Sequence, residues 1–178
     1  MTLSVLPLSS SLVRPPLGLQ VWLYHPHSLT DLLKARIPSV AVEVLRQDWE
    51  PRSWFDTYAL GVVDAIVLRR DIVMWGDDKP WWYAQTVIPK SSYDNAPDYF
   101  NRLERESIRH LIFATDGVKR VRMSYYPVDK HGVEYHWVAR HLPVNEPHFW
   151  VRFAEYCYQD DAPFYLFEVL FSELRHLS

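Results

Sequence analysis

The sequence predicts an α+β fold built around an antiparallel sheet. From Ser39 onward, apolar and polar residues alternate with a period of two, which is typical of strands. These runs follow one another through short turns, as in β-hairpins. Segments with helical periodicity precede the first predicted strand and interrupt the series of strands once. A parallel sheet would need a helix after each strand, so the pattern favours an antiparallel sheet.

Two short helices are predicted over residues 16–36, before the first strand. Apolar residues recur at helical spacing from Leu17, and Ser28 can cap the second helix. Asp31 follows three residues later, in a position resembling a capping box. The longest helix is predicted over residues 95–113, with a proline in its first turn.

The first strand is predicted over residues 40–49, and three strand–turn–strand units follow it. Each turn places Asp, Gly or Pro between two apolar runs, which is typical turn chemistry. The turns lie at residues 76–79, 129–132 and 160–163. The second unit therefore predicts a strand over residues 133–142.

Composition is sufficient for a packed core and excludes some partners. The chain is 48% hydrophobic, and its length predicts one domain over residues 16–178 after a flexible lead-in over residues 1–15. The net charge of −3 gives no electrostatic basis for nucleic-acid binding. No apolar run reaches the ~20 residues of a membrane span. We expect a monomer that binds small molecules.

The side-chain types give further expectations. A single cysteine, Cys157, excludes an intrachain disulfide and is typical of a reducing, cytoplasmic setting. The 27 aromatic residues, 15% of the chain, either fill the core and cover the sheet or line a pocket for a cyclic ligand. His131, His136 and His141 lack the tight spacing of a metal site. We expect no metal and no cofactor.

One arginine lies in an apolar strand row. Side chains alternate between the two faces of a strand. The row that contains Arg70 is otherwise apolar, whereas the row that contains Arg69 is mixed and predicted to be wetter. The Arg70 row consists of Ile66, Leu68, Arg70, Ile72 and Met74.

A carboxylate has a similar position in the last strand. Glu168 is the one polar residue of "PFYLFEVLF", so both faces of this strand read as buried. A buried charge that lacks a partner costs several kcal/mol. Either Arg70 and Glu168 form a structural salt bridge, or they face a small ligand with a carboxylate at one end and a hydroxyl at the other.

Three segments, taken in order and spacing, resemble the chorismate lyase family from about Leu19 to Leu174. "SLTDLL" resembles the family's Ser-[Leu/Met]-Thr motif. "LRRDIVMWGDDKPWWYAQTVIP" resembles its Arg-Glu-[Val/Ile] strand, turn and closing Pro. "PFYLFEVLF" resembles its terminal Glu-containing strand.

The resemblance implies a chorismate pyruvate-lyase, a carbon–oxygen lyase that converts chorismate to 4-hydroxybenzoate and pyruvate for ubiquinone biosynthesis. Arg70 then binds the ring carboxylate, Glu168 meets the ring hydroxyl, and the backbone amides of Leu29 and Ile108 complete the carboxylate site. The family fold implies a roughly six-stranded antiparallel sheet with helices on one face. It also implies a ligand cavity that is enclosed under two helical flaps.

This chain departs from the family pattern in three places. Many members have Arg where this chain has Gln85. They have Pro-[Leu/Ile]-Gly around Ile108, where this chain reads "ESIRHLIF". The segment over residues 114–149 is longer than in other members. The alternative function is a binding module of the same fold that recognises an aromatic carboxylate without turnover.

Overall fold

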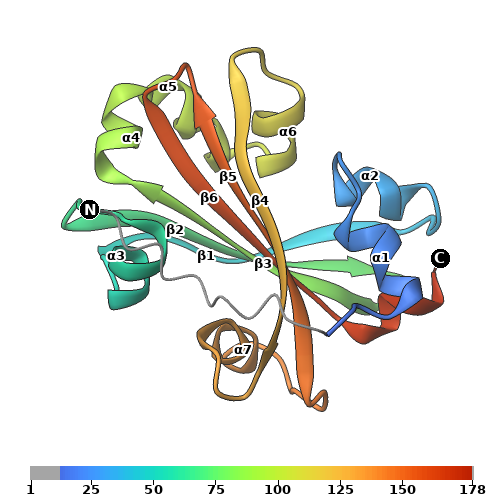
Figure 1. The fold of residues 1–178 in the computed structure, drawn as a ribbon. Coiled ribbons are helices and arrows are strands. Elements are labelled where there is room, and N and C mark those ends of the chain that lie inside the picture. The colour runs from blue at the N-terminus through green and yellow to red at the C-terminus, as the bar shows by residue number, and fades with distance from the viewer. Residues whose placement is uncertain (1–12, 178) are drawn as a thin grey trace.

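The computed structural model describes residues 13–177, in which six strands form one antiparallel sheet (Figure 1). The strand order is β1-β2-β3-β6-β5-β4, so the two halves of the chain meet where β3 pairs with β6. Most of the predicted lead-in, residues 1–12, lies outside the described residues. The strands are β1 (Val40–Pro51), β2 (Ile66–Gly76), β3 (Lys79–Pro89), β4 (Val118–Asp129), β5 (His148–Tyr158) and β6 (Ala162–Leu170).

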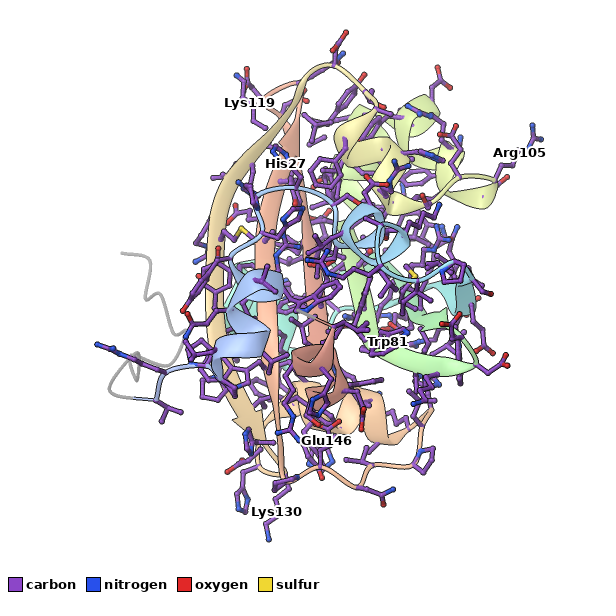
Figure 2. All side chains as sticks on the ribbon, turned by 90° about the vertical axis from the view of Figure 1, so that its right-hand side faces the viewer. His27, Trp81, Arg105, Lys119, Lys130 and Glu146 are labelled. Carbon is purple, nitrogen blue, oxygen red and sulfur yellow. The ribbon has the colours of Figure 1, made fainter. Side chains whose placement is uncertain are left out.

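Helices cover both faces of the sheet. The front face, defined by Leu68, Ile72, Leu166 and Leu170, packs under most of them, and α1 and α2 lie before it in Figure 2. The front-face elements are α1 (Leu17–Leu23), α2 (Leu29–Lys34), α4 (Lys90–Asn95), α5 (Pro97–Phe100), α6 (Ile108–Phe113), and the 3-10 turns η1 (Asn101–Glu104) and η2 (Ser172–His176). None of the described helices is long and apolar enough to cross a membrane.

The expectation that helices lie on one face is wrong. The back face, defined by Val67, Val73, Phe153 and Phe167, is as apolar as the front. Two helices cover it, α3 (Trp54–Leu60) and α7 (Val133–Ala139). Phe55 of α3 and Trp137 of α7 both pack against Phe167, with ring centroids 5.7 and 5.3 Å away. Sequence reasoning did not predict α3.

Helix α7 also corrects the predicted strand over residues 133–142. The alternating Val133, Tyr135 and Trp137 suggested a period of two, but the buried residues include Trp137 and Val138, as one face of a helix requires. His136 therefore lies on a helix rather than a strand. No group of three or more His, Cys, Asp or Glu side chains in residues 13–177 is arranged to hold a metal ion.

The first hairpin forms as predicted. Asp77 and Asp78 both have positive φ, as a two-residue turn between twisted strands requires. The hairpin aligns Arg70 with Thr86 and sets the two faces of β2. Arg70 shares the front face with Leu68 and Ile72, so the predicted row is correct.

The prediction that Arg69 lies on a wetter face is wrong. Arg69 is only 4% exposed because α3 packs over the back face beside it. Its guanidinium donates hydrogen bonds to Asp56 Oδ2 at 2.6 Å, to Gln85 Oε1 at 2.8 Å and to Glu50. Asp56 belongs to the capping box of α3, so the helix that buries Arg69 also supplies its counterion.

The helix predicted over residues 95–113 is broken into α5, η1 and α6. A continuous helix would bond the carbonyl of Leu103 to the amide of Ser107, and that of Glu106 to His110. Both carbonyls instead accept hydrogen bonds from Arg70, at 3.1 and 3.2 Å. A tertiary contact with the sheet thus replaces the local helical pattern and sets the position of α6.

Candidate functional site

A small cavity of about 40 Å³ lies between the front face of the sheet and helices α2 and α6. Arg70, Glu168 and Ile108, which were predicted from the sequence, all line it. Apolar side chains form most of the floor. The other lining residues are Thr30, Val42, Ile72, Met74, Trp82, Ala84, Thr86, Ser107, Arg109 and Leu166.

Arg70 is a buried cation without a protein counterion. It is 7% exposed, and its Nη1 donates only to the carbonyls of Leu103 and Glu106. Its Nε is buried without a hydrogen-bond partner. No carboxylate of the described chain lies within 4.0 Å of this guanidinium. Carbonyl oxygens satisfy part of the guanidinium and leave its charge uncompensated.

The other two buried arginines of the described chain are each paired with a carboxylate, which is the usual arrangement for a buried charge. Arg69 pairs with Asp56, and Arg152 pairs with Glu168. Burial lowers the pKa of Arg69, but the hydrogen bonds and charges of Asp56 and Glu50 outweigh burial and raise that pKa. Burial alone lowers the pKa of Arg70. Because an arginine remains protonated at neutral pH, Arg70 stays a cation on the cavity wall.

Glu168 pairs with Arg152 rather than with Arg70, so a structural salt bridge between Arg70 and Glu168 is not formed. Strand β3 lies between β2 and β6 and separates their backbones by about 10 Å. Arg152 lies directly opposite Glu168 on the neighbouring β5. Both side chains are buried, and the Arg152 Nη1 donates to Glu168 Oε2. Glu168 thus reaches the cavity as an oriented carboxylate.

Arg152 also holds the segment between α1 and α2. Its Nη2 donates to the carbonyls of His25 at 2.8 Å and His27 at 3.1 Å. His27 lies before the strands in Figure 2, where this linker crosses the sheet. Arg152 was not singled out in the sequence analysis. Its position between Trp150 and Ala154 in an apolar row was the signal that could have identified it as buried.

Helices α2 and α6 cover the cavity from two sides. The Ser28 hydroxyl accepts a hydrogen bond from the Asp31 amide and caps α2, as predicted. Leu29 and Ile108 are the first residues of α2 and α6, where amides have no acceptor within the helix. Ile108 lines the cavity, whereas Leu29 is 1% exposed and packs in the core behind it.

Residues 5–145 match the chorismate lyase family. This chain belongs to that family. A protein from Thiobacillus denitrificans named probable chorismate pyruvate-lyase is 30% identical over 161 residues, which cover 89% of this chain and 85% of that protein. A protein of the same name from Pseudoalteromonas translucida is 38% identical over 72 residues, 40% of each chain.

Solved structures of other proteins share the fold of this chain. The effector domain of PhnF from Mycobacterium smegmatis superposes with a TM-score of 0.56 at 16% identity, covering 90% of this chain and 94% of that one. A GntR-family transcriptional regulator from Bacillus cereus gives 0.55 at 14% identity, covering 75% and 92%. At these identities the likeness shows the fold alone.

Gln85, where many members of the family have Arg, does not line the cavity. Gln85 points to the back face and is 1% exposed. Its amide donates to Asp71 Oδ1 at 3.0 Å and accepts from Arg69 at 2.8 Å. Arg69 thus brings a guanidinium to the same back-face network in which Gln85 takes part.

We predict that Arg152→Met lowers the free energy of unfolding by about 3–5 kcal/mol, because it leaves the Glu168 carboxylate buried without its partner. The double variant Arg152→Met with Glu168→Leu should recover most of this loss. Arg122→Met is the matched control, since its pair with Glu155 at 3.3 Å is partly exposed and worth under about 1 kcal/mol. Urea unfolding measures all three. A stable single variant, or a double variant no better than the single, would contradict the assignment.

Proposed function

We propose that this chain eliminates pyruvate from chorismate and releases 4-hydroxybenzoate, the ring precursor for ubiquinone biosynthesis. The observation that carries the proposal is the environment of Arg70. A guanidinium that is buried, faces a cavity and has no protein carboxylate is suited to an anionic ligand. Its planar fork matches a carboxylate in two parallel hydrogen bonds.

The remaining polar groups fit the two ends of this ligand. Arg70 binds the ring carboxylate, and the amides of Ile108 and Leu29, at the starts of α6 and α2, complete that end of the site. Glu168, oriented by Arg152, accepts a hydrogen bond from the ring hydroxyl at the other end. The apolar floor that includes Ile72 and Leu166 contacts the ring. Arg70 and Glu168 are the residues we assign to catalysis.

The chemistry needs positioning more than proton transfer. The hydrogen on C4 of chorismate moves to the methylene of the enolpyruvyl group, which becomes the methyl group of pyruvate. The bond between C3 and the ether oxygen breaks, and a C3–C4 double bond completes the aromatic ring. Atoms and electrons balance without an oxidant or an external base. An enclosed site that holds the reactive conformation can therefore supply much of the rate.

Helices α2 and α6 are the proposed flaps. The cavity of about 40 Å³ is far smaller than the roughly 300 Å³ or more of typical ligand pockets. Substrate entry and product release then require these helices to move away from the sheet. Both helices are short, and the segment before each is held to the sheet by an arginine, Arg152 before α2 and Arg70 before α6.

The alternative function is a binding module for an aromatic carboxylate. The likeness to GntR-family effector domains favours it, since that fold is also used in transcriptional regulators. Such a module would bind 4-hydroxybenzoate through Arg70 without turnover. Both functions share the same anion site and differ in whether chorismate is consumed.

We predict that the purified chain converts chorismate to equimolar 4-hydroxybenzoate and pyruvate, followed by ultraviolet absorbance and by a coupled pyruvate assay. Arg70→Ala should lower kcat/KM about 30- to 5,000-fold, because loss of one partner of a buried charge pair costs about 2–5 kcal/mol. Arg105→Ala is the control, since Arg105 extends into solvent from the segment before α6 (Figure 2). A wild-type chain that binds 4-hydroxybenzoate but leaves chorismate intact would instead establish the binding module.

Enclosure gives a separate prediction. Adding 4-hydroxybenzoate should slow hydrogen exchange over residues 28–37 and 107–113, because closed flaps protect their amides. Helix α7 lies on the back face and should exchange at an unchanged rate. Mass spectrometry of peptides from all three segments measures the difference. Equal exchange in both flap segments with and without ligand would indicate an open groove.

A further inference from the structure

Arg109 joins the two flaps above the cavity. It is the second residue of α6, and its Nη2 lies 2.7 Å from Oδ1 of Asp31 on α2. Burial raises the pKa of the Asp31 carboxyl, but the hydrogen bond and charge of Arg109 outweigh burial and hold that pKa below its usual value. The Asp31 carboxylate therefore remains ionised at neutral pH, and its ion pair with Arg109 links α2 to α6.

Arg109 also has unused hydrogen-bonding capacity. Its side chain lines the cavity together with Arg70, and its Nε is buried without a hydrogen-bond partner. A guanidinium carries five N–H donors in a planar fork. The contact with Asp31 engages one end of that fork, so a second acceptor can be bound without breaking the link between the flaps.

The charges around the cavity are unbalanced. Among the described residues that line it, Arg70 and Arg109 are cationic and Glu168 alone is anionic. Glu168 is already paired with Arg152, which lies outside the cavity lining. Neither guanidinium is paired with a carboxylate from the cavity walls, because Arg70 has no protein carboxylate and Arg109 is paired with Asp31, which lies outside the lining. This arrangement matches a ligand that carries two separate carboxylates.

We propose that Arg109 binds the second carboxylate of the substrate and determines specificity for a dianion. This inference rests on the proposed function, in which chorismate carries a ring carboxylate and an enolpyruvyl carboxylate. Arg70 binds the first and Arg109 binds the second. The product 4-hydroxybenzoate retains only the ring carboxylate, so Arg109 distinguishes substrate from product.

The proposed contact depends on a residue in which this chain differs from the family pattern. In the resemblance to the family, Pro-[Leu/Ile]-Gly falls around Ile108, so that a glycine corresponds to Arg109. A glycine offers no side chain to a second carboxylate. With Arg109 in place, a series of polar contacts from Asp31 through Arg109 to the second carboxylate connects α2, α6 and the substrate. Binding a dianion then favours the closed position of both flaps.

Two stable ligands test the proposal by calorimetry. One is 4-hydroxybenzoate, with one carboxylate. The other is 3-(carboxymethoxy)-4-hydroxybenzoate, which adds a carboxylate on an ether oxygen beside the hydroxyl. Arg109→Gln should weaken binding of the dicarboxylate about 10- to 100-fold, the range expected for hydrogen bonds to a charged group, and change binding of 4-hydroxybenzoate less than about threefold. Retained binding of 4-hydroxybenzoate also shows that the variant is folded.

Two further variants separate a direct contact from a general charge effect. Arg105→Gln removes an equal charge from the solvent-facing part of the same segment and should leave both affinities unchanged. Arg109→Lys keeps the charge but not the fork, and should recover only part of the dicarboxylate affinity. Equal weakening of both ligands in Arg109→Gln, or no weakening of either, would overturn the proposal.

Turnover distinguishes failure of this inference from failure of the proposed function. Arg109→Gln should raise the KM for chorismate by a factor similar to its loss of dicarboxylate affinity. If the wild-type chain turns over chorismate and Arg109→Gln leaves KM unchanged, Arg109 is not the specificity residue and the lyase assignment stands. If the wild-type chain binds the dicarboxylate through Arg109 but does not consume chorismate, the dianion site stands and the lyase assignment fails.

Discussion

The site depends on one buried cation that the protein leaves without a counterion. Arg70 lies in an apolar row of β2, and its hydrogen bonds go to the carbonyls of Leu103 and Glu106. These contacts interrupt the helical path after η1, so that α6 begins above the cavity. Carbonyl dipoles stabilise the guanidinium but do not neutralise it. The same side chain therefore contacts the segment before α6, one of the two proposed flaps, and leaves its charge available to an anionic ligand.

The other buried arginines show why this arrangement is informative. On the back face, Arg69 is satisfied by Asp56, Glu50 and Gln85, and that network needs no ligand. On the front face, Arg152 neutralises Glu168 and also binds the α1–α2 linker. Because the described chain pairs its other two buried arginines with carboxylates, the third, Arg70, is suited to a carboxylate partner from outside the chain. That reasoning leads from Arg70 to a carboxylate ligand.

The sequence predicted the faces of the strands better than the contacts across them. Alternation placed Arg70 in its apolar row and marked Glu168 as buried, but it carries no information about which strands are neighbours. In the sheet, Arg70 lies opposite Thr86, and Thr86 lies opposite Leu166, so Arg70 is not aligned with Glu168. The helix α7 was predicted as a strand because its apolar residues also alternate. The break before α6 arises from a contact with Arg70, which local periodicity cannot reveal.

A cycle that changes one group on the protein and one on the ligand tests the central claim most directly. Affinities of 4-hydroxybenzoate and its neutral carboxamide, 4-hydroxybenzamide, are measured for the wild-type chain and for Arg70→Met. If the ligand carboxylate is the partner of Arg70, the two changes should be coupled by about 2–5 kcal/mol, and Arg70→Met should bind both ligands with similar affinity. Additive effects, with the wild-type preference for the carboxylate retained in Arg70→Met, would contradict the account.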